Sequence, residues 1–370
     1  MKRFLALILS LLFVLGALLA CGKKKSADTD AYKQNGEGEN TLDDELTELG
    51  ESVVYDNKDD EPQPHVPKAE STAGLAFEPT ADGRGYVLTG KGTCSAVNIV
   101  IDGYNDLPVT AVAPSAFKDF TSLIGVSLGG GIKSIGPDAF SGCTSLANII
   151  FPASLTNIGE GAFRGCSALA NVTFSEGIER IGAWAFSNCT SLTRISLPKG
   201  LKDIGGSAFY SCEKLMSITL PDTVTKIGNS AFYNTEYYND AKNWSKEVLL
   251  IGDCLIDVKK SVEGQYHVLP QARVIADGAF YACKGITTLS LPMDLTHIGD
   301  YAFYSCSALE SVEIYDTVIS IGASAFADCS AIKEVNIVKS GEWVGDENAE
   351  NKGNLPMSND EILKAIKPQA

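Results

Sequence analysis

Cysteine is the residue type whose number and spacing in this sequence could support chemistry. The chain has ten Cys in 370 residues, and seven of them stand three residues after a Phe that recurs at a spacing of 23: Cys143, Cys166, Cys189, Cys212, Cys283, Cys306 and Cys329. An even number of Cys can indicate disulfides, and thiolates are ligands for zinc. However, one Cys per repeat in a line is not a tetrahedral ligand set, and a disulfide needs Cβ atoms at roughly 3.5–4.5 Å, closer than strands about 4.8 Å apart would place them. We therefore expect free, buried thiols that pack as small hydrophobic groups, and no metal site.

Other side chains that commonly carry out catalysis are few and follow no known motif. The three His are His65, His267 and His297, and we expect His297 to lie on the surface. The sequence has no His-Glu-x-x-His, no phosphate-binding loop and no nucleophile elbow. The net charge of −16, with no basic stripe, argues against nucleic acid as a partner. The sequence therefore predicts a protein that is not an enzyme, with no catalytic residues and no cofactor.

An internal repeat of 23 residues organises the middle of the chain. Its pattern is I-G-x-x-A-F-x-x-C-x-x-L-x-x-I-x-L-P-x-x-L. Its Phe occurs in two runs, and the last Phe of the first run and the first Phe of the second are 48 positions apart: Phe117, Phe140, Phe163, Phe186, Phe209 and Phe232, then Phe280, Phe303 and Phe326. Repetition of this length predicts a solenoid, because one coil cannot close its own core and each side chain stacks on its equivalent in the next coil. We expect about nine regular coils, one irregular double coil, and a continuous buried spine of Phe.

Each repeat contains the pattern of two short strands. One is typified by Ile195–Pro198 and the other by Leu201–Gly205, where apolar residues alternate with outward-facing ones. Between them, the spacing of the Ala-Phe-x-x-Cys-x-x-Leu segment suits a helical or 3₁₀ turn. The Gly of each Ile-Gly pair predicts a tight corner with positive φ.

This pattern resembles the leucine-rich repeats of the BspA-like family, a 23-residue class found in bacterial surface proteins. The resemblance covers about residues 74–338. It implies a β-rich (α/β) leucine-rich-repeat solenoid that is curved, exported to the cell surface, and often attached to host proteins or other cells.

The N-terminal 70 residues differ from the repeats in composition. Residues 1–21 combine Lys2-Arg3 with an apolar stretch, as in a secretion signal. Cys21 follows Leu18-Leu19-Ala20 and resembles the lipidated Cys of a bacterial lipobox; an ordinary signal or an uncleaved anchor are the alternatives. Residues 22–70 are expected to be a disordered acidic tether, with 14 Asp or Glu against three Lys from position 26 onward.

Three further parts follow the tether. Residues 71–111 read as an N-terminal β cap that begins with a hairpin turning at Asp82-Gly83. Residues 112–338 are the solenoid. Residues 339–370 lose the period and form a C-terminal tail or cap, with a short helix expected over Glu361–Ile366.

The 23-residue repeat is interrupted by an irregular module at residues 233–279. A hairpin around Gly252 is expected there, preceded by a cluster of aromatic residues that includes Tyr237, Tyr238 and Trp244. Insertions in solenoids often map to the binding face, so these three aromatics are candidates for ligand binding. The alternative is that they fill a gap in the stack.

A second set of candidates lies on the first strand of each coil, where residues flanking the buried ones must point outward. They predict two parallel columns on one face of the sheet, formed by Asn148, Ile150, Asn171, Thr173, Arg194, Ser196, Ser217, Thr219, Thr288, Ser290, Ser311 and Glu313. Small polar residues of this kind suit a wet contact with protein or glycan.

Tyrosines next to the repeat Phe form a third candidate. They are Tyr210, Tyr233, Tyr281 and Tyr304, with Trp184 and Tyr301 nearby. Tyr and Trp are favoured at interface hot spots, and their rings could stack on sugars. They could equally shield the turn from water.

The sequence thus predicts a lipid-anchored protein of the cell membrane and cell surface. Its solenoid would bind an extracellular protein or glycan, as in adhesion to host proteins or between cells. The alternative is a structural envelope protein or a self-associating scaffold.

Overall fold

The computed structural model describes residues 72–340 and 357–366 of the chain. The expected signal peptide, the lipidation site Cys21, the acidic tether and His65 lie outside the described residues. Within these two ranges, no helix combines the length and hydropathy needed to cross a membrane.

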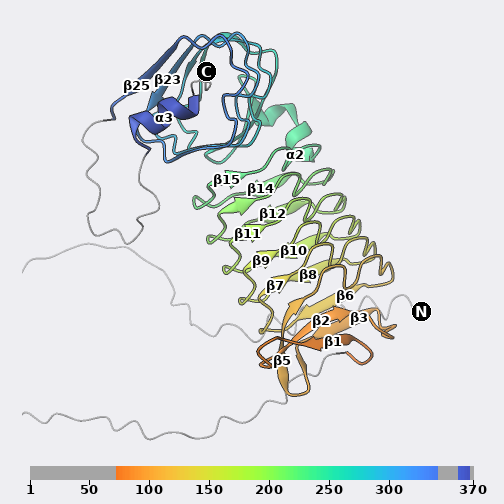
Figure 1. Ribbon diagram of the computed structural model, residues 1–370. Helices are drawn as coiled ribbons and strands as arrows, with labels where there is room; N and C mark the ends of the chain where they lie inside the picture. The colour runs from red at the N-terminus through yellow and green to blue at the C-terminus, as the bar shows by residue number, and fades with distance from the viewer. Residues whose placement is uncertain (1–71, 341–356, 367–370) are drawn as a thin grey trace, which may run out of the picture. The chain divides into compact units, whose positions relative to one another are not determined.

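The described chain winds into a β-solenoid of about 11 turns, and most of its regular structure is short strands (Figure 1). This confirms the predicted β-rich leucine-rich-repeat solenoid. Each regular repeat contributes one coil with two strands, which stack on the equivalent strands of neighbouring coils.

The strands that carry the Ile-Gly pair form the longest sheet. Neighbours pair in parallel with equal repeat positions side by side, so that Ile158 lies between Ile135 and Ile181. In spatial order the sheet contains β1 Ala76–Pro79, β2 Tyr86–Gly90, β5 Leu107–Val112, β7 Ser134–Ile135, β9 Asn157–Ile158, β11 Arg180–Ile181, β13 Asp203–Ile204 and β15 Lys226–Ile227, with β4 Gly103–Tyr104 paired to β5.

The other strand of each coil forms three smaller sheets. The first contains β3 Asn98–Ile101, β6 Gly125–Leu128, β8 Asn148–Ile150 and β10 Asn171–Thr173. The second pairs β12 Arg194–Ser196 with β14 Ser217–Thr219. The third contains β19 Glu263–His267, β21 Gly285–Ser290, β23 Ser311–Tyr315 and β25 Glu334–Val338.

The irregular module begins with helix α2 Glu236–Asn239 and the 3₁₀ helix Ala241–Asn243. The predicted hairpin follows: β17 Val248–Ile251 and β18 Cys254–Val258 are antiparallel, and Gly252 adopts a positive φ of 62° in the turn between them. The sheet built on this hairpin runs in the order β16 Trp244–Ser245, β17, β18, β20 Val274–Ile275, β22 His297–Ile298 and β24 Ser320–Ile321.

The segment around each Phe is a series of turns closed by bonds between residues i and i+3, as expected for a 3₁₀ turn, and these turns do not join into a continuous helix. In one coil, Asp138 has a φ of 53° and Gly142 a φ of 74°, on either side of Phe140. Residues in this left-handed region cannot continue a right-handed helix. The short bonds that remain, such as Cys143 N–H to the Phe140 carbonyl, close isolated turns.

The Gly of the Ile-Gly pair is required for a different reason from the predicted one. These glycines do not have a positive φ; the positive values lie two residues later, as at Trp184 with 53°. Instead, a Cβ on Gly182 would stand 2.6 Å from the Glu160 nitrogen and 2.7 Å from the Gly159 carbonyl carbon. Successive coils therefore approach each other too closely for any side chain at this corner.

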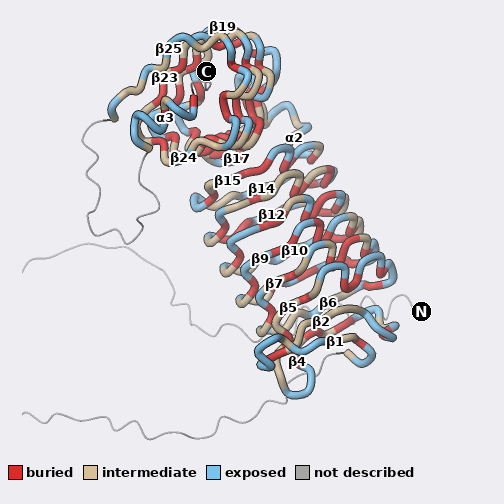
Figure 2. Tube along the Cα trace, viewed as in Figure 1, coloured by how far each residue is buried: buried red, intermediate tan, exposed pale blue. Residues whose placement is uncertain are grey.

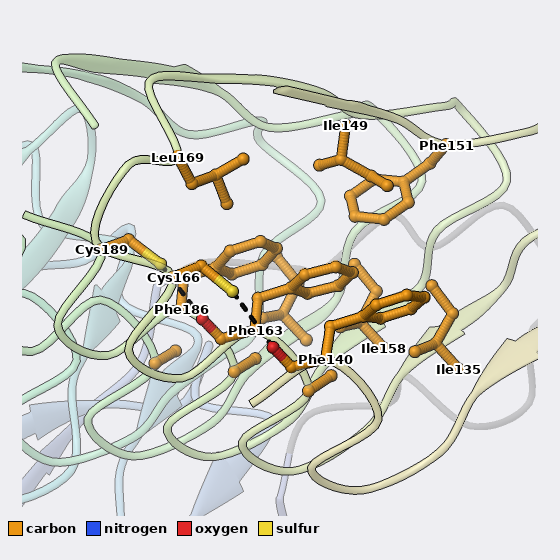
Figure 3. Close-up of a cluster of buried hydrophobic side chains, with 14 of the residues drawn as sticks. Ile135, Phe140, Ile149, Phe151, Ile158, Phe163, Cys166, Leu169, Phe186 and Cys189 are labelled. Atoms are coloured by element: carbon orange, nitrogen blue, oxygen red, sulfur yellow. Dashed lines mark hydrogen bonds between the residues drawn. The ribbon is translucent and has the colours of Figure 1, made fainter. Parts of the chain in front are cut away.

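Phenylalanine rings form the centre of the core. From Phe117 to Phe232, equivalent rings of neighbouring coils stack with centroids 5.1–5.5 Å apart and planes within 10° of parallel. Figure 3 shows three of them, Phe140, Phe163 and Phe186. The second run, from Phe280 to Phe326, stacks at 4.7 and 4.8 Å. Such offset stacking stabilises the core beyond what burial of the rings contributes, because the positive edge of one ring lies over the negative face of the next.

The repeat cysteines are buried free thiols, and all of them except Cys283 donate a hydrogen bond to a carbonyl of the preceding coil. Cys166 Sγ donates to the Phe140 carbonyl and Cys189 Sγ to the Phe163 carbonyl, both at 3.2 Å (Figure 3). A thiol thus fills a small space and gives a buried carbonyl an additional donor.

The hydrophobic core consists of two clusters, with buried residues lining the inside of the coils (Figure 2). The Phe spine is correspondingly interrupted: no ring contact in the described ranges joins Phe232 to Phe280, in contrast to the continuous spine we predicted. The hairpin β17–β18 accounts for the break. Ile256 belongs to the first cluster and Leu255 to the second.

Each cluster also has an end cover. The predicted N-terminal hairpin is confirmed as the antiparallel pair β1–β2, and its Leu88 is fully buried in the first cluster. Helix α3 Asn359–Ile366 buries Ile362 and Ile366 in the second cluster. This helix begins two residues before the predicted start, because Ser358 and Glu361 form a capping box around its first turn.

Candidate ligand-binding surface

The first-strand candidates are brought into register on the outside of the coils. In β8, β10, β12 and β14 every candidate is exposed, because the central residue of each three-residue strand points inward. Asn171 lies beside Asn148 and donates from Nδ2 to its Oδ1 at 2.8 Å; Arg194 lies beside Ser217. The pairing also places Thr173 beside Ile150 and Ser196 beside Thr219.

The columns are interrupted, which differs from the two unbroken lines expected. β10 and β12 belong to different sheets, and the irregular module separates β14 from β19. In the third sheet Thr288 and Ser290 lie beside Ser311 and Glu313, and all four are half-buried. The exposed part of the columns is thus the stretch from β8 to β14.

The tyrosines next to the repeat Phe stack in two short ladders. Tyr210 and Tyr233 have ring centroids 5.7 Å apart, and Tyr281 and Tyr304 have centroids 5.2 Å apart. Tyr233 and Tyr281 are 45% and 46% exposed. Each ladder follows from the 23-residue period, because a residue beside a stacked Phe must stack as well.

The module's aromatic side chains use their polar ends within the protein. Tyr237 donates its hydroxyl to the Leu250 carbonyl at 3.0 Å, and Trp244 Nε1 donates to the Tyr238 carbonyl at 2.7 Å. All three rings pack against the first cluster. These contacts agree with the gap-filling alternative for Tyr237, whereas Tyr238 and Trp244 also line hollows on the surface.

Two adjacent hollows meet at Tyr238, which together with Asp257 and Lys260 lines both of them. The first has a volume of about 210 Å³ and is also lined by Tyr233, Tyr281 and Asp277. The second has a volume of about 340 Å³ and is also lined by Trp244, Asn239 and Lys259. Asp257, Asp277, Lys259 and Lys260 were not among the predicted site residues. The hairpin pattern was the one sequence signal near Asp257.

A hydrogen bond holds together Tyr238 and Asp257, two of the side chains that line both hollows. The Tyr238 hydroxyl donates to Asp257 Oδ2 at 2.6 Å, while Asp257 Oδ1 accepts from the Val258 nitrogen at 2.8 Å and faces Lys260 Nζ at 3.6 Å. Burial, reinforced by the adjacent carboxylate, raises the pKa of Tyr238 well above its ordinary value. The phenol therefore stays protonated as a donor.

His297 is half-buried rather than fully on the surface. Burial, and to a smaller extent the charge of Arg273, lowers the pKa of His297. Its Nδ1 lies 2.9 Å from the Thr296 hydroxyl of the same strand region. Within the described ranges, no group of three His, Cys, Asp or Glu side chains is placed to hold a metal ion. The arrangement can contact a ligand by stacking and hydrogen bonding.

Coils of 23 residues with paired parallel strands and a stacked Phe core define the class: a leucine-rich-repeat solenoid. The chain belongs to the BspA type leucine rich repeat family, whose model matches residues 110–239 and 265–358 in six copies. No curated protein matches the chain by sequence.

Several solved structures resemble it at low identity. A leucine rich cell surface protein from Faecalibacterium prausnitzii A2-165 is 19% identical, over 82% of this chain and 98% of that chain, with a TM-score of 0.44. The leucine rich repeat protein of T. pallidum is 24% identical, over 72% and 91%, with a TM-score of 0.36. The pneumococcal vaccine antigen PcpA is 19% identical, over 72% and 73%, with a TM-score of 0.33. Because these identities and TM-scores are low, the assignment of the chain to the family rests on the match to the family model.

Proposed function

We propose that this chain is a non-catalytic binding protein of the cell surface, held by a lipid on Cys21, whose solenoid attaches to an extracellular macromolecule. The observation that carries the proposal is the exposed polar side chains of two strand pairs, β8 with β10 and β12 with β14, which stand in register within each pair. Long, shallow surfaces of this kind suit macromolecular partners. The family match and the secretion-type N-terminal sequence support the cell surface.

The covered ends argue against the alternative of a scaffold that grows through its coil edges. The hairpin β1–β2 and helix α3 each bury apolar residues against the neighbouring cluster. Covering a coil end in this way takes its apolar side chains away from a second copy of the chain, while β1, β3, β24 and β25 remain the outermost strands of their sheets among the described residues.

The anchor can be tested in cells that express the full chain. Wild-type protein should enter the detergent phase when membranes are extracted and should incorporate labelled fatty acid, and Cys21→Ala should incorporate none. External protease should degrade the wild-type solenoid on intact cells. Protection of the solenoid on intact cells, with digestion only after lysis, would contradict a surface location.

The binding face can be tested with charge substitutions that leave the core untouched. The triple variant Asn171→Glu, Arg194→Glu, Ser217→Glu should reduce binding to extracellular-matrix proteins or to other cells by at least tenfold, with an unchanged melting temperature. The matched control is Glu213→Lys, Lys214→Glu, an exposed pair in the turns. Equal binding by the triple variant would place the site elsewhere, and concentration-dependent oligomers without any ligand would favour the scaffold.

A further inference from the structure

The two hollows on either side of Tyr238 have the chemistry of a sugar-binding groove. We propose that they bind two successive residues of a neutral oligosaccharide chain. The inference rests on the proposed function, since it names a ligand class for a protein displayed outside the cell. It concerns a surface separate from the polar columns of β8 to β14.

Exposed aromatic rings are the first observation. Tyr233 and Tyr281 both line the first hollow and are nearly half exposed. Each has a stacking partner in its own ladder, while no ring contact within the described residues joins the two across the hollow. The apolar C–H face of a pyranose can pack on such a ring, because its polarised hydrogens meet the negative face of the aromatic system.

The second observation is that hydrogen-bond donors and acceptors line the first hollow together with these rings. In the first hollow Asn229, Ser230, Asp257 and Asp277 have lone pairs that can accept, while the Asn229 amide and the Lys260 ammonium can donate; the Ser230 hydroxyl already donates to Asn229 Oδ1 at 2.9 Å. A sugar hydroxyl both donates and accepts, so a mixed lining of this kind suits it. The carboxylate of Asp277 accepts one bond, from the Asp300 nitrogen at 2.7 Å, and keeps further lone pairs for a ligand.

Charge is the third observation, and it favours a neutral ligand. Across both hollows, two carboxylates, Asp257 and Asp277, face two ammonium groups, Lys259 and Lys260. The ammonium of Lys259 is already placed over the Trp244 ring, 4.5 Å from its centroid. A phosphate or sulfate would meet one carboxylate for every cation and gain little from the site.

The arrangement of the hollows points to a chain rather than a single sugar. At about 210 and 340 Å³ they lie at or below the small end of ligand pockets, which are typically ~300–1,000 Å³. Tyr238 lines both and is fixed by its bond to Asp257. Each hollow can therefore hold one ring, and the affinity of a single ring should be weak.

The test uses the full chain and isothermal titration calorimetry with cellohexaose, maltohexaose, mannohexaose, xylohexaose and the hexamer of N-acetylglucosamine. At least one hexamer should bind, and its monosaccharide should bind at least tenfold more weakly. Tyr281→Ala should weaken the hexamer at least tenfold. The matched control is Tyr104→Ala, which removes a ring of similar exposure, 40%, outside the hollows and should stay within twofold.

The outcomes separate this inference from the proposed function. Failure of all five hexamers, or equal affinity in Tyr281→Ala and wild type, overturns the sugar site. If a matrix protein binds instead and Tyr281→Ala abolishes that binding, the hollows are a protein-docking surface and the inference is wrong. The strand-face triple variant should keep its sugar affinity, so loss of protein binding there leaves the inference intact. Equal melting temperatures of Tyr281→Ala and wild type exclude unfolding as the cause.

Discussion

Leu255 and Ile256 are neighbours in strand β18, yet their side chains enter two different hydrophobic clusters. Leu255 is fully buried in the second cluster, and Ile256 is 8% exposed in the first. A strand turns successive side chains to opposite faces. The hairpin β17–β18 therefore serves as a shared wall, which covers the last coil of one stack and the first coil of the next.

This wall predicts a separation of effects between adjacent residues. Leu255→Ala should reduce amide hydrogen-exchange protection mainly in the coils of Phe280 and Phe303. Ile256→Ala should do so mainly in the coils of Phe209 and Phe232. Each substitution removes buried apolar atoms and should cost roughly 2–5 kcal/mol, and in a solenoid the loss should be greatest in the nearest coils. Exchange measured by mass spectrometry checks this; the same pattern for both variants would show one undivided core.

The second prediction concerns the close approach of coils at the Ile-Gly corner. Gly182→Ala should destabilise the protein by about 1–3 kcal/mol or more, because the new methyl would collide with the backbone of Gly159 and Glu160. Gly130→Ala is the control, since a Cβ there meets nothing within 4 Å and the φ is not positive. Denaturant unfolding measures both. Equal stability of the two variants would mean that the corner relaxes.

Native thiol reactivity is the third prediction. Burial raises the pKa of Cys143 to about 12 and that of Cys283 to about 11, and it raises the pKa of Cys189 as well. Because the thiolate is the reactive form, iodoacetamide at pH 8 should leave Cys143, Cys189 and Cys283 unmodified until denaturant is added. Peptide mass spectrometry reads the sites. Labelling of Cys189 in the native protein, or disulfide-linked repeat peptides, would contradict the finding that the repeat cysteines are buried free thiols.

The fourth prediction is a pH effect of Asp277. Burial raises the pKa of this carboxyl to about 6, against the lowering effects of the bond from the Asp300 nitrogen and of the Lys226 charge; the charges of Asp300 and Asp203 raise it by smaller amounts. The folded state therefore holds the proton more tightly than the unfolded state. The contribution of this group to stability is greatest below pH 4 and falls as the pH rises towards 6.

Asp277→Asn removes this dependence while an amide oxygen can still accept from the Asp300 nitrogen. At pH 7 the variant should be more stable than wild type, by on the order of 1–2 kcal/mol. At pH 4 the two should differ little. Urea unfolding at both pH values is the measurement. A variant that is less stable at pH 7 would show that the Lys226 contact outweighs the burial of the charge.

Much of the fold follows from the period alone. Phe163 must meet Phe140 and Phe186, because a 23-residue coil brings each position beside its own equivalent. The same logic predicts the register of the strands, the buried cysteines, the tyrosine ladders and the outward direction of Asn171 and Arg194. The type of a single residue was less informative than the period. Gly182 suggested a corner with positive φ, but glycine is required there because the backbones of neighbouring coils approach each other closely.

The sequence by itself determined a leucine-rich-repeat solenoid with a stacked Phe core and a polar strand face. Only the tertiary structure decided how residues 233–279 interrupt it, and hence where Tyr233, Tyr281 and Asp257 come together. The reason is physical: within the period every contact repeats between equal positions, so one repeat defines the rest. Where the period fails, contacts depend on how an inserted hairpin packs between two cores, and no neighbouring repeat carries that information.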